Sequence, residues 1–254
     1  MDQLPNLGRE QEMLDIMGVS SMKDLFEDIP VEIRSEGTLP LPPPQTEEEI
    51  LRDAERLLGA NVNLDSRPSF ISAGLARNFV PSMVPMIATR GEFLTSYTPY
   101  QPEVSQGMLQ AMWEFQTMIS ELVGLPISNV SMYDASTSAA EAITCAVRVK
   151  SKKVEMPNTV YVSEWVPPHR MSVIENYTQG VGIEIRKIPH DEDGFLDLNL
   201  AAEASGSCAI YVEQPNAFGI LDEGLLRLRE VVGDKTAIIV GVDVTSLGIV
   251  EPPG

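Results

Sequence analysis

The run Cys208-Ala209-Ile210-Tyr211-Val212 decides the fold of this chain, because it is a short apolar stretch that leads into the polar triplet Gln214-Pro215-Asn216. Comparable runs stand at residues 159–162, 182–186 and 237–242, and the segments between the runs show helical spacing. Short apolar strands that alternate with helices predict βαβ units and a mostly parallel sheet covered on both faces. Ligands of such sheets bind beyond the carboxyl ends of the strands, where the triplet and Asp243 stand.

The strongest helical pattern upstream of the sheet opens at Ser105 and ends at Gly124. Its apolar side chains recur every three or four residues and include Met108, Met112 and Phe115. A face of this breadth predicts a deeply buried helix. Further helices are expected at residues 139–149, 168–179, 198–204 and 221–232.

Residues 1–66 are predicted to form a helical arm with a proline-rich strap, and residues 67–254 part of an α/β major domain. In the arm, Gly18 is a plausible end for a first helix. The run Leu39-Pro40-Leu41-Pro42-Pro43-Pro44 cannot be helical. Thr46 with the carboxylates after it then fits a helix start.

The composition excludes several classes of partner. The chain carries 18 basic and 37 acidic side chains, a net charge of −19. Such a surface repels phosphate backbones and anionic membranes, so neither nucleic acid nor a membrane is an expected partner. No apolar run reaches membrane-spanning length and no secretory leader is recognisable, so a cytoplasmic protein is expected. Cys145 and Cys208 are interpreted as buried free thiols, without a disulfide or a zinc site.

The loop from Tyr97 to Gly107 is the first candidate for function, because Pro99 and Pro102 stiffen a polar segment directly before the long helix. Its rigid backbone would present four polar side chains at defined positions: Thr98, Tyr100, Gln101 and Glu103. The alternative is a stiff connector whose tyrosines only pack.

Two further places could hold a phosphorylated cofactor. Ser136 and Thr137 open a helix and could cradle a phosphate, although one of them could equally be an ordinary N-cap. Asp243 could pair with a protonated pyridine nitrogen or a metal, although strand-end carboxylates more often accept from neighbouring backbone amides. His169 and His190 have no partners at metal-ligand spacing and are interpreted as surface residues, so no metal site is predicted.

Lysine provides evidence against a resident cofactor. A pyridoxal phosphate enzyme needs a lysine for its Schiff base. The six lysines of the chain stand at positions 23, 150, 152, 153, 187 and 235, and none follows the strand that ends at Asp243. Aspartate aminotransferase-like folds place their lysine after that strand, so this chain should not form its own internal aldimine.

The loop block, with Arg90 and Glu92-Phe93 before it and Phe115-Gln116-Thr117-Met118-Ile119 after it, resembles the first (alpha) subunit of the decarboxylating glycine dehydrogenase. That enzyme is the P-protein of the glycine cleavage system. Further blocks match in the same order: Ser131-Met132-Tyr133-Asp134, Glu213-Gln214-Pro215-Asn216 and Ser246-Leu247-Gly248. The resemblance spans essentially the whole chain.

The resemblance implies the aspartate aminotransferase-like fold, fold type I of the pyridoxal phosphate enzymes, and a division of labour in a heterotetramer. A second subunit would carry the lysine and the pyridoxal 5'-phosphate. The whole enzyme would decarboxylate glycine and pass the aminomethyl group to the lipoyl arm of the H-protein. In this chain no residue would be catalytic alone; Thr98, Tyr100, Gln101 and Glu103 would face the partner's pocket, and Ser136, Thr137 and Asp243 would be vestigial.

The family's first subunits run on past Gly254, and the chain stops directly after a buried strand, so we expect the carboxyl-terminal portion of the domain to be missing. Two other readings remain. One is a self-sufficient pyridoxal phosphate enzyme whose lysine lies in a continuation. The other is an inert fragment or interaction module.

Overall fold

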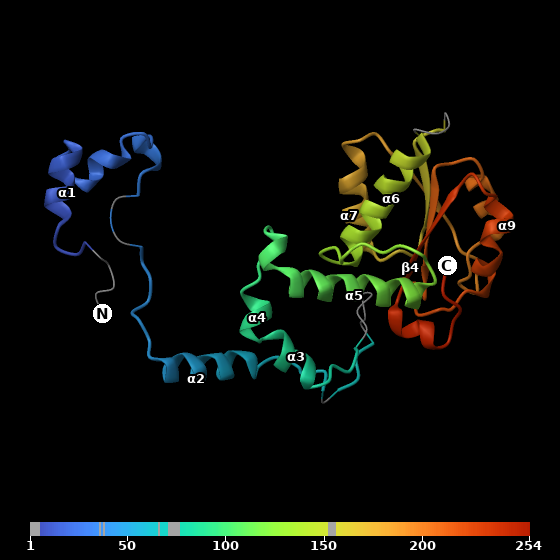
Figure 1. Ribbon diagram of the computed structural model, residues 1–254, viewed down its shortest axis with the longest axis horizontal. Helices are drawn as coiled ribbons and strands as arrows, with labels where there is room; N and C mark the ends of the chain where they lie inside the picture. The colour runs from blue at the N-terminus through green and yellow to red at the C-terminus, as the bar shows by residue number, and fades with distance from the viewer. Residues whose placement is uncertain (1–5, 36, 38, 66, 71–76, 152–155) are drawn as a thin grey trace. The chain divides into compact units, whose positions relative to one another are not determined.

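A computed structural model describes residues 6–35, 37, 39–65, 67–70, 77–151 and 156–254 (Figure 1). The chain divides into two compact units, Met1–Pro68 and Ser69–Gly254, and each is described by itself. The predicted boundary between residues 66 and 67 stays a prediction, because residue 66 lies outside the described residues.

The first unit contains helices and extended segments. Its elements are α1 (Glu10–Met17), η1 (Met22–Phe26), η2 (Val31–Ile33) and α2 (Glu47–Leu58). Gly18 ends α1 with a φ of 72°, as expected. Thr46 starts α2 through a capping box with Glu49, also as expected. Among the described residues of this unit, Leu14 is the one buried side chain, so the unit has almost no core of its own.

The second unit is built on a four-stranded parallel sheet in the order β2-β1-β3-β4. Its strands are β1 (Thr159–Ser163), β2 (Glu184–Ile188), β3 (Ala209–Gln214) and β4 (Ala237–Val242). All of β1 is buried, and so is β3 up to its last residue, whereas β2 and β4 are the edges. The expected parallel α/β sheet is therefore confirmed, and the second strand lies two residues later than predicted.

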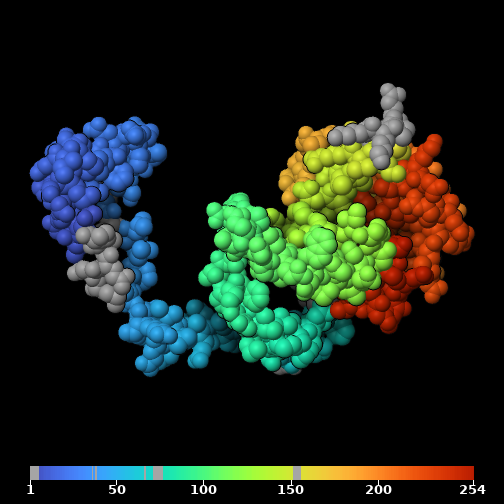
Figure 2. Space-filling model, viewed as in Figure 1, coloured from blue at the N-terminus to red at the C-terminus, as the bar shows by residue number. Residues whose placement is uncertain are grey.

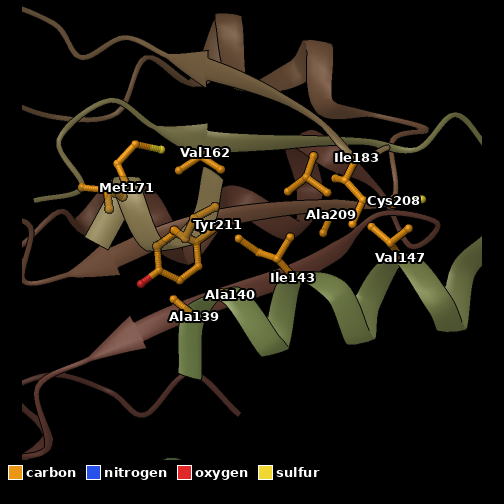
Figure 3. Close-up of a cluster of buried hydrophobic side chains, with 13 residues drawn as sticks. Ala139, Ala140, Ile143, Val147, Val162, Met171, Ile183, Cys208, Ala209 and Tyr211 are labelled. Carbon is orange, nitrogen blue, oxygen red and sulfur yellow. The ribbon is translucent and has the colours of Figure 1, made fainter. Parts of the chain in front are cut away.

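Helices cover both faces of this sheet (Figure 1). α6 (Ala135–Ser151) and α7 (Pro168–Gln179) pack on one face over a core that contains Ile143, Ile174 and Tyr211 (Figure 3). The other face carries α8 (Leu198–Ala201), η4 (Ala202–Ala204), η5 (Glu223–Arg227) and α9 (Leu228–Val232) over a second core. The helix expected at 221–232 thus begins as a 3₁₀ turn, because the Asp222 carboxylate accepts from the Gly224 amide.

Upstream of the sheet lie α3 (Met83–Ala88), α4 (Gly91–Leu94), η3 (Pro102–Val104) and α5 (Gln106–Val123). The prediction that the long helix is deeply buried is wrong: no residue of α5 is buried, and Trp113 is 69% exposed. Residues 106–123 lie at the surface of the unit in Figure 2. Only the central stripe of the broad apolar face is half-buried, because little of this chain packs against α5.

Two smaller expectations about burial are also wrong. Cys208 is buried, but Cys145 is exposed on α6 because it faces away from the sheet. His190 was placed at the surface, but its side chain is only 4% exposed because the ring of Trp165 stacks on it.

The topology marks one crevice in the sheet. β1 connects to β2 through α7 on one face, whereas β2 connects to β3 through α8 and η4 on the other. The chain therefore switches faces between β1 and β3. In open parallel sheets, ligands bind outside the carboxyl ends of the strands at such a switch point.

Candidate functional site

An ion pair spans the switch point. Arg170, in the first turn of α7 directly after β1, donates to the Glu213 carboxylate near the end of β3. Both side chains are largely buried, with 15% and 7% of their surfaces exposed. The Tyr211 hydroxyl also donates to Glu213, at 2.9 Å. Side chains of the protein itself therefore join the start of α7 to the end of β3 at this point.

The charges in this cluster support one another. Burial lowers the pKa of Arg170, but the hydrogen bond and charge of Glu213 outweigh it and hold that pKa above its ordinary value. Burial, together with the Glu213 charge, raises the pKa of Tyr211. Arg170 is thus charged and Tyr211 neutral at physiological pH. The absence of a side chain at Gly241 of β4 leaves room for the Tyr211 side chain, because a Cβ at position 241 would lie 2.7 Å from the tyrosine hydroxyl oxygen.

The first turn of α6 is capped by a carboxylate. Asp134 Oδ1 accepts from the Thr137 amide at 2.6 Å and from the Thr137 hydroxyl at 2.8 Å. These bonds, the backbone amide first, hold the pKa of Asp134 below its usual range. The expectation that Ser136 or Thr137 caps the helix is therefore wrong: Asp134 is the cap, Ser136 is buried and Thr137 is half-buried.

Asp243, directly after β4, is half-buried and turned to its own backbone. Its Oδ1 accepts from the Thr245 amide at 2.9 Å and from the Thr245 hydroxyl at 2.7 Å. It starts η6 (Val244–Gly248). The sequence allowed two roles for Asp243, a contact with a cofactor or the capping of its own backbone. The structure shows the capping role.

The residues of this edge do not fit a resident pyridoxal phosphate. The N-terminus of α6, the natural place for a phosphate, already holds the ionised Asp134 carboxylate, which would repel it. In the described part of the chain no lysine stands at the ends of β3 or β4: Lys150 lies in the last turn of α6, Lys187 lies on the far edge strand β2 and Lys235 precedes β4.

The loop before α5 is the other candidate site, and it is exposed. Tyr100 is 86% exposed, and its amide donates to the Thr98 carbonyl at 2.9 Å, so the loop is held by its own backbone. An open groove of about 410 Å³ lies between this loop and α5. Glu103 lines the groove; Thr98, Tyr100 and Gln101 do not. Its lining is Pro102, Glu103, Gln106, Leu109, Gln110 and Trp113.

A compact aromatic cluster lies at the carboxyl ends of β1 and β2. Trp165 stacks on His190 with ring centroids 4.4 Å apart and meets Phe218 edge-on at 4.8 Å. His190 Nε2 lies 3.3 Å from the Ser163 hydroxyl, and Nδ1 has no hydrogen-bond partner among the described residues. In this cluster the imidazole acts as a packed aromatic ring.

Burial lowers the pKa of His190, although the carboxylates of Glu164, Asp222 and Asp191 act in the opposite direction. The folded protein therefore takes up a proton at lower pH than the unfolded chain, whose histidine titrates near about 6.5. Stability should be complete above that value and fall as the pH drops below it, by at most about 1.4 kcal/mol per pH unit for one proton.

Urea titrations between pH 7.5 and 5.5 check this, because most carboxylates titrate below that range. We expect His190→Gln to remove most of the slope and the exposed His169→Gln to leave it unchanged. An equal slope in all three proteins would mean that His190 is not the titrating group.

The sequence did not predict the buried ion pair of this edge. Arg170 and Glu213 are 43 residues apart, and no local pattern links them. Asp134 could have been found, since an aspartate three residues before a threonine at a helix start is a capping pattern. Gln214 and Asn216 organise the loop after β3: Asn216 Oδ1 accepts from the amides of Phe218 and Ile220.

Two findings that bear on other chemistry concern the described residues alone. None of their helices combines the length and apolar character that a membrane crossing requires. Nor do three or more histidine, cysteine, aspartate or glutamate side chains gather there in a way that could hold a metal ion.

The parallel sheet with its helices is the large-domain fold of the fold type I pyridoxal phosphate enzymes. A distant structure with this fold is the glutamate decarboxylase domain of a Vibrio parahaemolyticus protein, with a TM-score of 0.54 and 12% identity over 95% of this chain and 58% of that one. This likeness shows the fold alone.

Closer comparisons define the family. The sequence model of the glycine cleavage system P-protein matches residues 5–254. A probable glycine dehydrogenase (decarboxylating) subunit 1 of Thermococcus kodakarensis is 43% identical over 99% of this chain and 54% of its own length. Its counterpart in Saccharolobus solfataricus is 40% identical over 99% and 55%.

A crystal structure of glycine decarboxylase (P-protein) in inhibitor-bound form superposes with a TM-score of 0.79 and 37% identity, over 100% of this chain and 56% of that one. The chain belongs to the glycine cleavage system P-protein family. It spans about half the length of the curated relatives that it matches.

Proposed function

We propose that this chain works as a part of glycine dehydrogenase (decarboxylating) that does not bind the cofactor, and that it helps to form an active site whose pyridoxal phosphate is held by a second subunit. The observation that carries this proposal is the carboxyl edge of its sheet. The Arg170–Glu213 pair bridges the switch point, and the Asp134 carboxylate caps the N-terminus of α6, where a phosphate would otherwise be expected to bind. Family membership supports the proposed reaction, decarboxylation of glycine, and we propose the lipoylated H-protein as the acceptor.

The exposed loop before α5 would be the contribution of this chain to that site. Thr98, Tyr100, Gln101 and Glu103 are polar side chains on a backbone held by prolines and local hydrogen bonds. Because the loop is already rigid, these groups could contact a small amino acid and exclude water without a further loss of conformational entropy on binding. A cytoplasmic location is part of the proposal, supported by two unpaired cysteines.

The experiment is glycine-dependent exchange of labelled bicarbonate, measured for this chain, for the lysine-bearing subunit, and for the two mixed with H-protein. We expect exchange only in the mixture, and the visible absorbance of bound pyridoxal phosphate only in preparations with the second subunit. Exchange and cofactor absorbance in this chain alone would contradict the proposal.

Within the mixed enzyme, Tyr100→Ala and Glu103→Gln should each lower the exchange rate about tenfold or more, equivalent to about 1.4 kcal/mol. The reason is that both groups would face the reacting molecule. Glu192→Ala, in the exposed turn after β2, is the matched control and should leave the rate unchanged. If both loop variants exchange at the normal rate while the complex remains intact, the loop acts only as a connector and does not contact the reacting molecule.

A further inference from the structure

We propose that His190 and Glu164 form a proton-operated latch between the loops that follow β1 and β2. When the imidazole takes up a proton from solvent, its Nδ1 is drawn to the Glu164 carboxylate and the ring leaves its stack on Trp165. The two loops then part at the carboxyl edge while the sheet stays folded. The inference does not depend on the proposed function, because every group in it belongs to this chain.

The imidazole of His190 is the point where the two loops meet. Its side chain is 4% exposed, and its ring lies parallel to the Trp165 indole, with an interplanar angle of 4°. Nε2 lies 3.3 Å from the Ser163 hydroxyl oxygen, which also accepts from the Trp165 amide at 3.3 Å. The stack and this hydroxyl group therefore hold the uncharged ring in place.

The other ring nitrogen, Nδ1, is the incomplete part of this arrangement. It is buried, and no hydrogen bond reaches it from the residues that the structure describes. Glu164 Oε1 lies 3.8 Å from Nδ1, too far for a hydrogen bond but close enough for a charge on the ring to act on it. An imidazolium carries an N–H on both nitrogens, so a protonated His190 must donate at Nδ1 as well as at Nε2.

Glu164 can receive that second donor because it is already anchored beside the ring. Its Oε1 accepts from the His190 backbone amide at 2.8 Å, and its side chain is 38% exposed. Closing the gap to Nδ1 takes a movement of about 1 Å. Since the amide holds the carboxylate, the ring is the part that moves, toward the solvent side where a charge costs less. A movement of this size breaks the parallel contact with the indole.

Three carboxylates face the ring from three segments of the chain. Burial has the largest effect and lowers the pKa of His190, while the charges of Glu164, Asp222 and Asp191 act against it, in that order. Asp222 precedes η5, and Asp191 lies in the same turn as His190. Two backbone amides hold each of these two carboxylates. Glu164 is thus the carboxylate placed to pair with the charged ring.

Trp165 transmits the movement to the rest of the edge. Its indole meets Phe218 edge-on, with centroids 4.8 Å apart, and lies against Gly194. It therefore joins the loops after β1, β2 and β3. The loops can open at a lower cost than the sheet, because β1 and most of β3 are buried in the core. Mild acid should separate the loops first.

The test follows the exposure of Trp165 to solvent at pH 7.5 and 5.0. The chain has two tryptophans, so Trp113→Phe leaves Trp165 as the one emitter. Acrylamide is the quencher, because it is uncharged and the net charge of −19 does not repel it. We expect its quenching constant to rise at least about twofold at pH 5.0, with an unchanged far-UV circular dichroism spectrum. The midpoint should match the titration of the His190 ring, followed by NMR and assigned with His169→Gln.

Glu164→Gln is the decisive variant. Its amide oxygen can still accept from the His190 amide, but it carries no charge to draw Nδ1. We expect a lower midpoint for the ring titration and the loss of most of the rise in quenching. Glu192→Gln, exposed in the turn after β2, is the matched control and should keep both. His190→Gln should give a quenching constant that does not depend on pH.

Four results would overturn the proposal. The first is a ring that stays uncharged in the folded chain at pH 5.0, and the second is a charged ring with an unchanged exposure of Trp165. The third is a rise in quenching that accompanies loss of the far-UV signal, because the sheet would then unfold together with the loops. The fourth is a rise in Glu164→Gln equal to that in Glu192→Gln, because the carboxylate would then play no part. None of these results bears on the proposed function.

Discussion

Replacing Arg170 by methionine is expected to lower the free energy of unfolding by about 3–5 kcal/mol, the cost of leaving one partner of a buried ion pair without its counter-charge. Glu213 is 7% exposed, and among the residues that the structure describes it would keep the Tyr211 hydroxyl as its one side-chain donor. Methionine retains much of the volume of the arginine stem, so packing loss adds little. The effect is large because the carboxylate has little access to water.

Urea unfolding at pH 7 measures the change, and a double-mutant cycle separates the pair from its surroundings. In Arg170→Met/Glu213→Gln the charge is removed with its partner, while the amide oxygen can still accept from Tyr211. We expect this variant to regain most of the loss and to lie within about 1–2 kcal/mol of the wild type.

The exposed pair Arg186–Glu184 is the matched control. Its side chains are 53% and 57% exposed, so Arg186→Met should cost less than about 1 kcal/mol. A cost for Arg170→Met no greater than this would mean that the pair is solvated in solution, and the crevice would then be open to a ligand after all.

The sheet could be predicted from sequence because each strand carries its own signal. β4 begins and ends at the predicted residues, since Ala237 to Val242 is uniformly apolar between a polar turn and Asp243. The helix ends at Gly18 and Gly124 were also local signals, a glycine that takes a positive φ. Local chemistry decides such features.

The burial of α5 could not be predicted in the same way. A broad apolar face predicts that a helix packs its apolar surface against another element, but it does not identify the molecule that covers this surface. Leu109, Met118 and Leu122 satisfy the pattern for a core helix and are exposed in this chain. The exposed apolar face of α5 thus follows a general rule: periodicity predicts a contact without identifying the partner.

The polar site shows a second limit. Ser136, Thr137 and Asp243 were picked as residue types that can bind a phosphate or a pyridine nitrogen, and all three lie at the predicted edge. Their availability depended on neighbours that sequence spacing does not reveal, namely the Asp134 cap and the Thr245 donors. Residue type indicates what a site could bind, while the competing hydrogen bonds decide what it does.

Gly194→Ala is expected to lower the free energy of unfolding by about 2–4 kcal/mol, the sum of backbone strain and overpacking. Gly194 has a φ of +91°, where a side chain is strained. A Cβ there would lie 2.5 Å from Ile220 Cδ1 and 2.6 Å from Trp165 Cζ3. The indole cannot yield easily, because Trp165 is held between His190 and Phe218.

Gly206→Ala separates the two causes, since Gly206 has a similar φ of +80° with nothing within 4 Å of a Cβ. It should cost about 1 kcal/mol, from the backbone alone. Unfolding monitored by tryptophan fluorescence gives both values, and a shifted Trp165 emission in folded Gly194→Ala would report the displaced ring. Equal costs for the two variants would show that the aromatic cluster adapts to a methyl group. An excess for Gly194→Ala means that the loops after β1, β2 and β3 are locked together by packing.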